Sequence, residues 1–342
     1  MFTEPAGSTV VKRIICLLFF MVVAPGMGNT AELPPNGSAA RTVSAGYFYD
    51  SAVAEKPTIH DVGERIRIAK GIDPERIAEF TGIHEAVAFP GDSDPDADDF
   101  REEAYSQLRS EIRMTYAEVA STRNQIVEVK RGLELLKQMV AIATAQYASG
   151  KLDQMQLLKG QIEWEKLFEL LLQLEKKEKI FGIRLNVLTG TAAEETVPPL
   201  EALGEYSPTF NPGELIESYK SRRFLALFQQ MVKPEFTATS GEGAHGIDTL
   251  EVESTVFVSV VKVSLEELYR RAHLYRTSLI LKAELAHATR LELYKNGRLD
   301  FSTLVEGLMV LSDLRRGYQA LLGEAHLLKA KVEYVTGASI DP

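Results

Sequence analysis

A heptad pattern of apolar residues limits what this chain can fold into more than any other feature. From Tyr105 to Tyr147, apolar or small residues recur at spacings of three and four, and no proline interrupts them. This spacing is typical of a helix that packs lengthwise against other helices. A helix over residues 98–148 would be about 75 Å long, which exceeds the diameter of a small domain. Such a helix must run along partner helices rather than through a compact core.

The same spacing resumes from Leu157 to Leu188, after the short stretch "ASGKLD". Gly150 can adopt the left-handed conformation that ends a helix. Asp153 can cap the next helix, with Gln156 three residues on in the capping-box position. Residues 98–190 are therefore predicted to form one long antiparallel helical hairpin.

The hairpin sequence occurs twice. "YASGKLDQMQLLKG" at 147–160 matches "YKNGRLDFSTLVEG" at 294–307, and the offset of 147 residues holds without a gap to the final Thr-Gly of each half. Asn296 and Gly297 would end one helix and Asp300 would cap the next. We interpret this as an internal repeat that places a second helical hairpin at 265–337, with its first helix starting near Leu265.

The N-terminus has the pattern of a signal peptide over residues 1–31. Lys12 and Arg13 precede an apolar run from Ile14 to Ala24, and small residues follow it. The run is too short to span a membrane as a helix, although an anchored or buried N-terminal helix is the alternative. The only cysteine, Cys16, lies inside the run. The exported chain would therefore have no disulfide and no thiolate metal site.

Composition argues against some functions. The net charge of −10 disfavours nucleic acid as a partner, because phosphate binding needs clustered Lys and Arg. No nucleophile, base and acid stand in a recognisable catalytic pattern. We therefore expect no enzyme activity, no cofactor and no metal site.

The region between the hairpins changes character. Residues 191–233 are predicted to be a connector that contains a short helix, and residues 234–264 a β segment. The β segment rests on the run from Thr255 to Val263, which is rich in β-branched residues. The N-terminal segment, 32–97, is predicted to hold short helices and weak strands at 44–54 and 85–89.

An exported chain with two long hairpins, each preceded by a β segment, resembles the TolC-like outer membrane efflux family, in a shortened form. The likeness rests on Tyr147, Gly150, Asp153 and Leu157, followed by a long helix that closes on "LNVLTG". The resemblance implies a homotrimer whose hairpins form a periplasmic α-barrel and whose β segments contribute to an outer membrane β-barrel in the lipid. It also implies docking to a periplasmic adaptor protein and, through it, to an inner membrane pump. The assembly would be a tripartite efflux or type I secretion-like system that conducts substrate from the periplasm to the exterior.

The resemblance also assigns roles to particular residues. The contacts with the adaptor would be made at the hairpin tips, by Tyr147, Gly150, Leu152, Tyr294, Gly297 and Leu299. Glu306 would be a carboxylate at the pore entrance, and a solvated helix residue is the alternative. If too few strands exist to close a barrel, the chain would instead be a soluble periplasmic coiled-coil scaffold that binds a partner through its tips.

Overall fold

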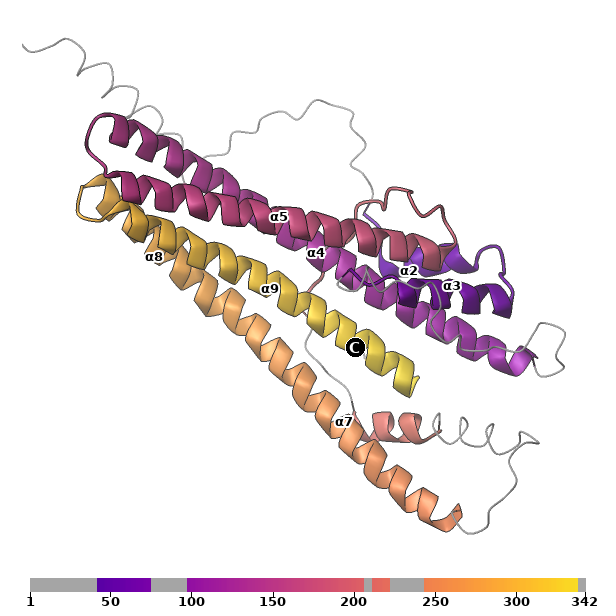
Figure 1. Cartoon of the computed structure of the whole chain (residues 1–342). Coiled ribbons are helices and arrows are strands. Elements are labelled where there is room, and N and C mark those ends of the chain that lie inside the picture. Colours follow the sequence, from indigo (N-terminus) through magenta and orange to yellow (C-terminus); the bar gives the residue numbers. More distant parts are fainter. Residues whose placement is uncertain (1–41, 75–96, 206–210, 222–242, 338–342) are drawn as a thin grey trace, which may run out of the picture. The chain divides into compact units, whose positions relative to one another are not determined.

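A computed structural model describes residues 42–74, 97–205, 211–221 and 243–337, and these are predominantly helical. The first long hairpin consists of α4 (Ala97–Ala148) and α5 (Gln154–Thr189). The second consists of a continuous helix, in three parts, and α9 (Phe301–Thr336). The three parts are α7 (Gly243–Leu274), a π-helical turn η2 (Tyr275–Leu279) and α8 (Ile280–Lys295) (Figure 1). The mainly helical fold with two long hairpins is thus confirmed.

The helix bounds of the two halves follow the offset of the sequence motif. Helices α5 and α9 both have 36 residues, and both their first and their last residues are separated by 147 positions. The helix that precedes the second tip starts at Gly243, not near Leu265 as predicted. The two hairpins are therefore closely matched in length.

The strand predicted within the β segment is wrong. Residues 243–264 belong to α7, while residues 234–242 lie outside the described residues. Val258, Val261 and Leu265 are buried at spacings of three and four, which is helical periodicity. Exposed valines fill the opposite face of the helix. In a run of consecutive β-branched residues, the sequence pattern does not distinguish the two-residue period of a strand from the 3.6-residue period of a helix. The prediction therefore rested on composition alone, which favoured a strand.

Two short helices precede the first hairpin. Helix α2 (Ala45–Val53) replaces the weak strand predicted at 44–54, and α3 (Ile59–Gly71) begins with a complete capping box between Thr58 and Asp61. The second weak strand, at 85–89, lies outside the described residues. Among the residues that are described, β pairing is limited to a single parallel bridge between Val43 and Leu200.

Helix α9 holds the two hairpins together, because it packs against α4, α5, α7 and α8. Near the tips, Leu136, Leu167, Phe301 and Val305 form part of one hydrophobic cluster that includes both hairpins. Farther from the tips, a second cluster joins α2 and α3 to α4, α5 and α9. Within the described part of the chain, α5 makes no contact with α7 or α8. Helix α5 therefore lies at one edge of this arrangement of helices, and α7 and α8 lie at the opposite edge.

The connector is fixed to the first hairpin by Arg123. Its guanidinium donates to the backbone carbonyls of Pro198 and Val197, at 2.7 and 3.0 Å, and pairs with Glu178 at 2.8 Å. One planar side chain thus ties the connector to α4 and α5 through three hydrogen bonds.

Candidate functional site

The two hairpin tips have the same backbone structure. The N–H of Gly150 donates to the carbonyl of Tyr147, and the N–H of Gly297 donates to that of Tyr294, both at 2.9 Å. The φ angles of the two glycines are 72° and 67°, in the left-handed region where a side chain is costly. Each tip is therefore a tight helix-ending turn that needs glycine.

An aspartate starts the helix after each tip. The carboxylate of Asp153 accepts from the backbone N–H of Gln156 at 2.9 Å, and that of Asp300 accepts from Thr303 N–H at 2.8 Å. Asp300 also accepts from the hydroxyls of Thr303 and Ser302. These hydrogen bonds, led by the Thr303 N–H, lower the pKa of Asp300 to about 2. Both aspartates satisfy N–H groups that the first turn of a helix leaves without partners.

Direct contacts join the two tips. The hydroxyl of Tyr294 donates to the side-chain carbonyl of Gln146 on the first hairpin. The N–H of Phe301, at the start of α9, donates to Gln156 Oε1 at 3.0 Å. The Phe301 ring is buried and lies 5.9 Å from the Tyr294 ring. The tips therefore form one unit, and nothing in the sequence predicted that Gln146 and Gln156 would connect them.

The predicted tip residues differ in exposure. Gly150, Gly297 and Tyr147 are exposed, whereas Leu152, Leu299 and Tyr294 are partly covered. Two basic residues, Lys151 and Arg298, are exposed beside the glycines. The capping residues Asp153 and Asp300 are exposed as well, so the unit presents backbone, one aromatic ring and charges of both signs to solvent.

Glu306 lies farther along α9, where it forms an ion pair with Lys159 of α5 at 2.5 Å. Its side chain is 57% exposed. The carboxylate is therefore accessible to solvent but carries a partner from the other hairpin.

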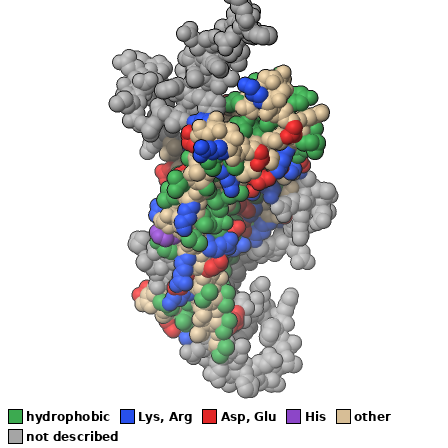
Figure 2. Space-filling view, turned by 90° about the vertical axis from the view of Figure 1, so that its left-hand side faces the viewer, with side chains coloured by type: hydrophobic (Ala, Val, Ile, Leu, Met, Phe, Trp, Pro, Cys, Tyr) green, Lys and Arg blue, Asp and Glu red, His purple; other side chains and the backbone are tan. Residues whose placement is uncertain are grey.

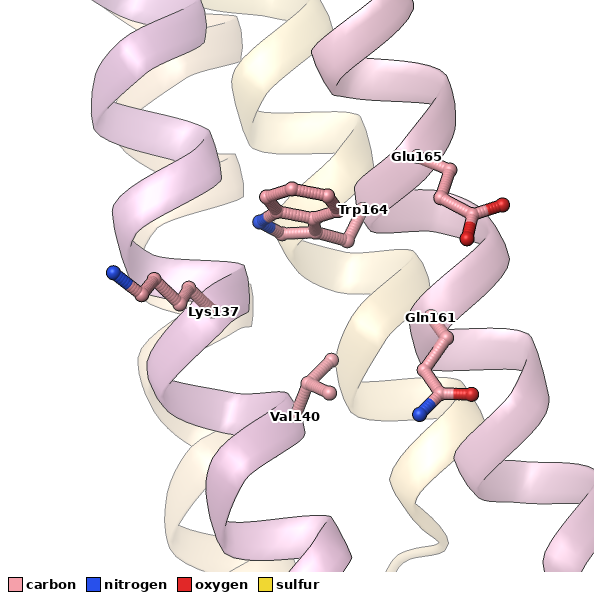
Figure 3. Close-up of a pocket in the computed structure, with 5 residues that line it drawn as sticks. All are labelled: Lys137, Val140, Gln161, Trp164 and Glu165. Atoms are coloured by element: carbon pink, nitrogen blue, oxygen red, sulfur yellow. The ribbon is translucent and has the colours of Figure 1, made fainter.

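A shallow cavity of about 340 Å³ lies between α4 and α5, and it is lined by Lys137, Val140, Gln161, Trp164 and Glu165. The indole of Trp164 extends from α5 towards α4 (Figure 3) and stacks on Phe168 with 5.4 Å between ring centres. The lining has no nucleophile and base in contact. The described residues also contain no cluster of three or more His, Cys, Asp or Glu that could hold a metal ion.

Both edges of the arrangement carry exposed apolar residues at helical spacing. On α5 these are Met155, Leu158, Ile162, Phe168 and Leu172. On the opposite edge they are Val252, Val256, Val260, Val263, Leu274, Leu281 and Leu285. Figure 2, which views the molecule from the side of the tips, shows hydrophobic side chains interspersed with Lys and Arg. We call the exposed apolar residues on α5 the α5 stripe, and those on the opposite edge the α7–α8 stripe.

No described helix combines the length and the hydropathy needed to cross a membrane.

Known proteins resemble this chain in structure. No protein-family model and no curated protein sequence matches it. Among solved structures, the outer membrane channel OprN aligns with a TM-score of 0.55 and 11% identity over 94% of this chain and 98% of its own. The Campylobacter jejuni outer membrane channel CmeC aligns at 0.52 and 10% identity, over 92% of this chain and 93% of its own. The Vibrio cholerae outer membrane protein VceC aligns at 0.51 and 12% identity, over 87% and 97%.

The chain therefore has the fold of TolC-like outer membrane channels. This confirms, at the level of the fold, the resemblance stated from the sequence.

Proposed function

We propose that this chain is the subunit of an outer membrane efflux channel, in which three copies close a ring of hairpins. The observation that carries the proposal is the presence of apolar stripes on both edges of the arrangement and on different helices. A surface that pairs with a different surface of the next copy generates a ring when the rotation closes. Exposed apolar patches at such positions are typical of protein interfaces.

The charges near the two stripes are complementary. Glu165 on α5 and Lys282 on α8 are both exposed, and neither forms an ion pair within the described part of the chain. They lie at similar distances along the helices from their tip ends, at Gln154 and Lys295. Opposite charges at matched heights favour α5 of one copy beside α8 of the next and fix the register between them.

Cysteine cross-linking tests the ring. We expect Ile162→Cys combined with Leu285→Cys to give covalent dimers and trimers on mild oxidation, since the only natural cysteine lies in the predicted signal peptide. Ile162→Cys combined with Arg131→Cys is the matched control, because Arg131 is exposed on α4 away from both stripes. Equal cross-linking in the two variants would contradict this interface.

The paired tips are the part of the chain that we propose to dock a periplasmic adaptor, which would connect it to an inner membrane pump. Their exposed glycines, Tyr147 and basic residues support a contact made through backbone and charge. Proline cannot adopt the positive φ of Gly150 and Gly297, so proline at both positions should abolish capture of the adaptor. Asparagine at both positions tolerates this φ and should retain capture. Retained capture by the proline variant would contradict the assignment.

A soluble periplasmic scaffold is the second candidate function. The observation that favours it is the helical structure of residues 243–264, where a strand was predicted for the membrane part. Cell fractionation with a urea wash separates the two candidates. Recovery of the exported chain in urea-washed outer membranes would support the channel, and recovery in the soluble periplasm would support the scaffold.

A further inference from the structure

The two hairpins differ in the seam between their helices. In the first hairpin, α4 contributes Leu133, Leu136, Val140 and Ala143 to a largely buried apolar seam. The residues at the matching positions of α8, 147 residues later, are Ile280, Ala283, His287 and Arg290. Accordingly, α8 has no fully buried residue. The second hairpin thus places a titratable group and a permanent charge where the first has a valine and an alanine.

His287 lies in this seam without a hydrogen-bond partner for one ring nitrogen. Its Nδ1 is buried, and no described group bonds to it. Arg290, one turn further along α8, lies against Gly307 of α9, where an added Cβ would come within 2.6 Å of the guanidinium. On the other side, Arg315 of α9 pairs with Glu284 of α8 at 2.5 Å. Both guanidiniums lie close enough to the imidazole of His287 to disfavour its protonation.

The nearby carboxylates are already paired with other cations. On α8, Glu284 pairs with Arg315 and Glu292 with Lys295. On α9, Glu306 pairs with Lys159 and Asp313 with Arg316. At η2, Arg276 is held by Glu205. A proton added to His287 would thus find two neighbouring cations, while each of these described carboxylates already has a cationic partner.

We propose that the α8–α9 seam is an acid-sensitive joint, in which protonation of His287 separates α8 from α9 while the α4–α5 seam stays closed. The inference concerns these helices alone and holds for a channel or a scaffold. The π-helical turn η2 stands at the far end of α8 from the tip. Such turns weaken the regular helical hydrogen bonding and allow a local bend. The separated part would therefore be α8 together with the second tip.

The direction of the effect follows from the proton balance. Burial, and then the charges of Arg290 and Arg315, lower the pKa of His287 below its ordinary 6.5 in the closed seam. In an open seam the imidazole regains its ordinary pKa. The open form therefore binds the proton more readily, and closure is weakened as the pH falls below about 6.5. One proton can raise the ratio of open to closed forms by at most about tenfold per pH unit.

Spin labels on the exported full-length chain, diluted with unlabelled chain, test the joint. One pair, at Ala288→Cys and Val310→Cys, reports the α8–α9 distance. A second pair, at Ala141→Cys and Glu163→Cys, occupies the matching positions of the first hairpin. Between pH 7.5 and pH 5, we expect the first distance to lengthen or broaden and the second to remain unchanged. Unchanged distances in both pairs, or equal changes in both, would overturn the proposal.

Two variants assign the effect to His287. His287→Val, which introduces the residue found at the matching position Val140, should keep the seam closed at pH 5. His287→Lys should open it already at pH 7.5, and circular dichroism would verify that the helices persist. If the valine variant opened in acid like the unmodified chain, another group would be responsible and the proposal would fail.

Discussion

Lys159 and Glu306 occupy matching positions in the two halves of the chain and form an ion pair with each other at 2.5 Å. The pair joins α5 of the first hairpin to α9 of the second, close to the tip end of each helix. Because both side chains are substantially exposed, the pair contributes little to overall stability. Because it links the two hairpins directly, we expect it to hold their spacing near the tips.

We expect Lys159→Met to increase the distance between the hairpins near the tips with almost no change in the unfolding temperature. Spin labels at Lys151→Cys and Arg298→Cys would measure that distance. The exchanged variant, Lys159→Glu with Glu306→Lys, should restore it. Lys166→Met breaks a pair within α5 alone and serves as the control. A tip distance that Lys166→Met changes as much as Lys159→Met would show that the link has no specific role.

A close contact at Gly160 leads to a second prediction. A Cβ at Gly160 would lie 2.6 Å from Cε1 of Phe301, a buried ring that joins the two tips. Gly160→Ala should therefore destabilise the chain by about 1–3 kcal/mol, as overpacked cores do. At Gly182, also in α5, the nearest atom would be 3.4 Å away, so Gly182→Ala should stabilise by about 0.5–1 kcal/mol through helix propensity. Thermal unfolding of the two variants would have to shift in opposite directions.

The helical conformation of residues 255–263 is testable residue by residue. Val258 and Val261 are 2% and 5% exposed, whereas Val260 is 59% exposed. Replacement by alanine should cost about 1–3 kcal/mol at either buried valine and little at Val260. In a strand, positions 258 and 260 would share a face and respond alike. Denaturant unfolding that ranked Val260→Ala with Val258→Ala would therefore contradict the helix.

The long hairpins could be predicted because heptad spacing and tip chemistry are local signals. Gly150 and Asp153 indicate where one helix ends and the next begins without any knowledge of the packing around them. The segment around Val258 carried no such signal. Its conformation follows from burial against Leu215 and Val332, which are distant in sequence.

The same distinction between local and long-range signals applies to the candidate site. Its turns could be predicted from their glycines, but its cross-links could not. Gln146 and Lys159 are ordinary polar residues on helix surfaces, and Gln156 was expected only in the capping box of α5. Their contacts between the hairpins arise because the second hairpin lies beside the first. The matching offset of Lys159 and Glu306 was visible in the sequence, although nothing indicated that the two side chains meet.

The cap at the second tip predicts a pH dependence in strong acid. Asp300 accepts three hydrogen bonds, and its lowered pKa, about 2, means that the cap stabilises α9 above about pH 4 and is lost as the pH falls through about 2.

Asp300→Ala should therefore cost about 1 kcal/mol at neutral pH, and Asp300→Ser, which keeps an acceptor, should cost less. Chemical unfolding at pH 7 and at pH 2 would measure both. The difference between the alanine variant and the unmodified chain should shrink at pH 2, where about half of the Asp300 carboxylates in the folded chain are protonated. Asp313→Ala removes an exposed carboxylate of α9 that caps no helix, so it controls for charge alone. A penalty for Asp300→Ala that stayed constant across this range would mean that the side chain contributes through its shape rather than through its charged hydrogen bonds.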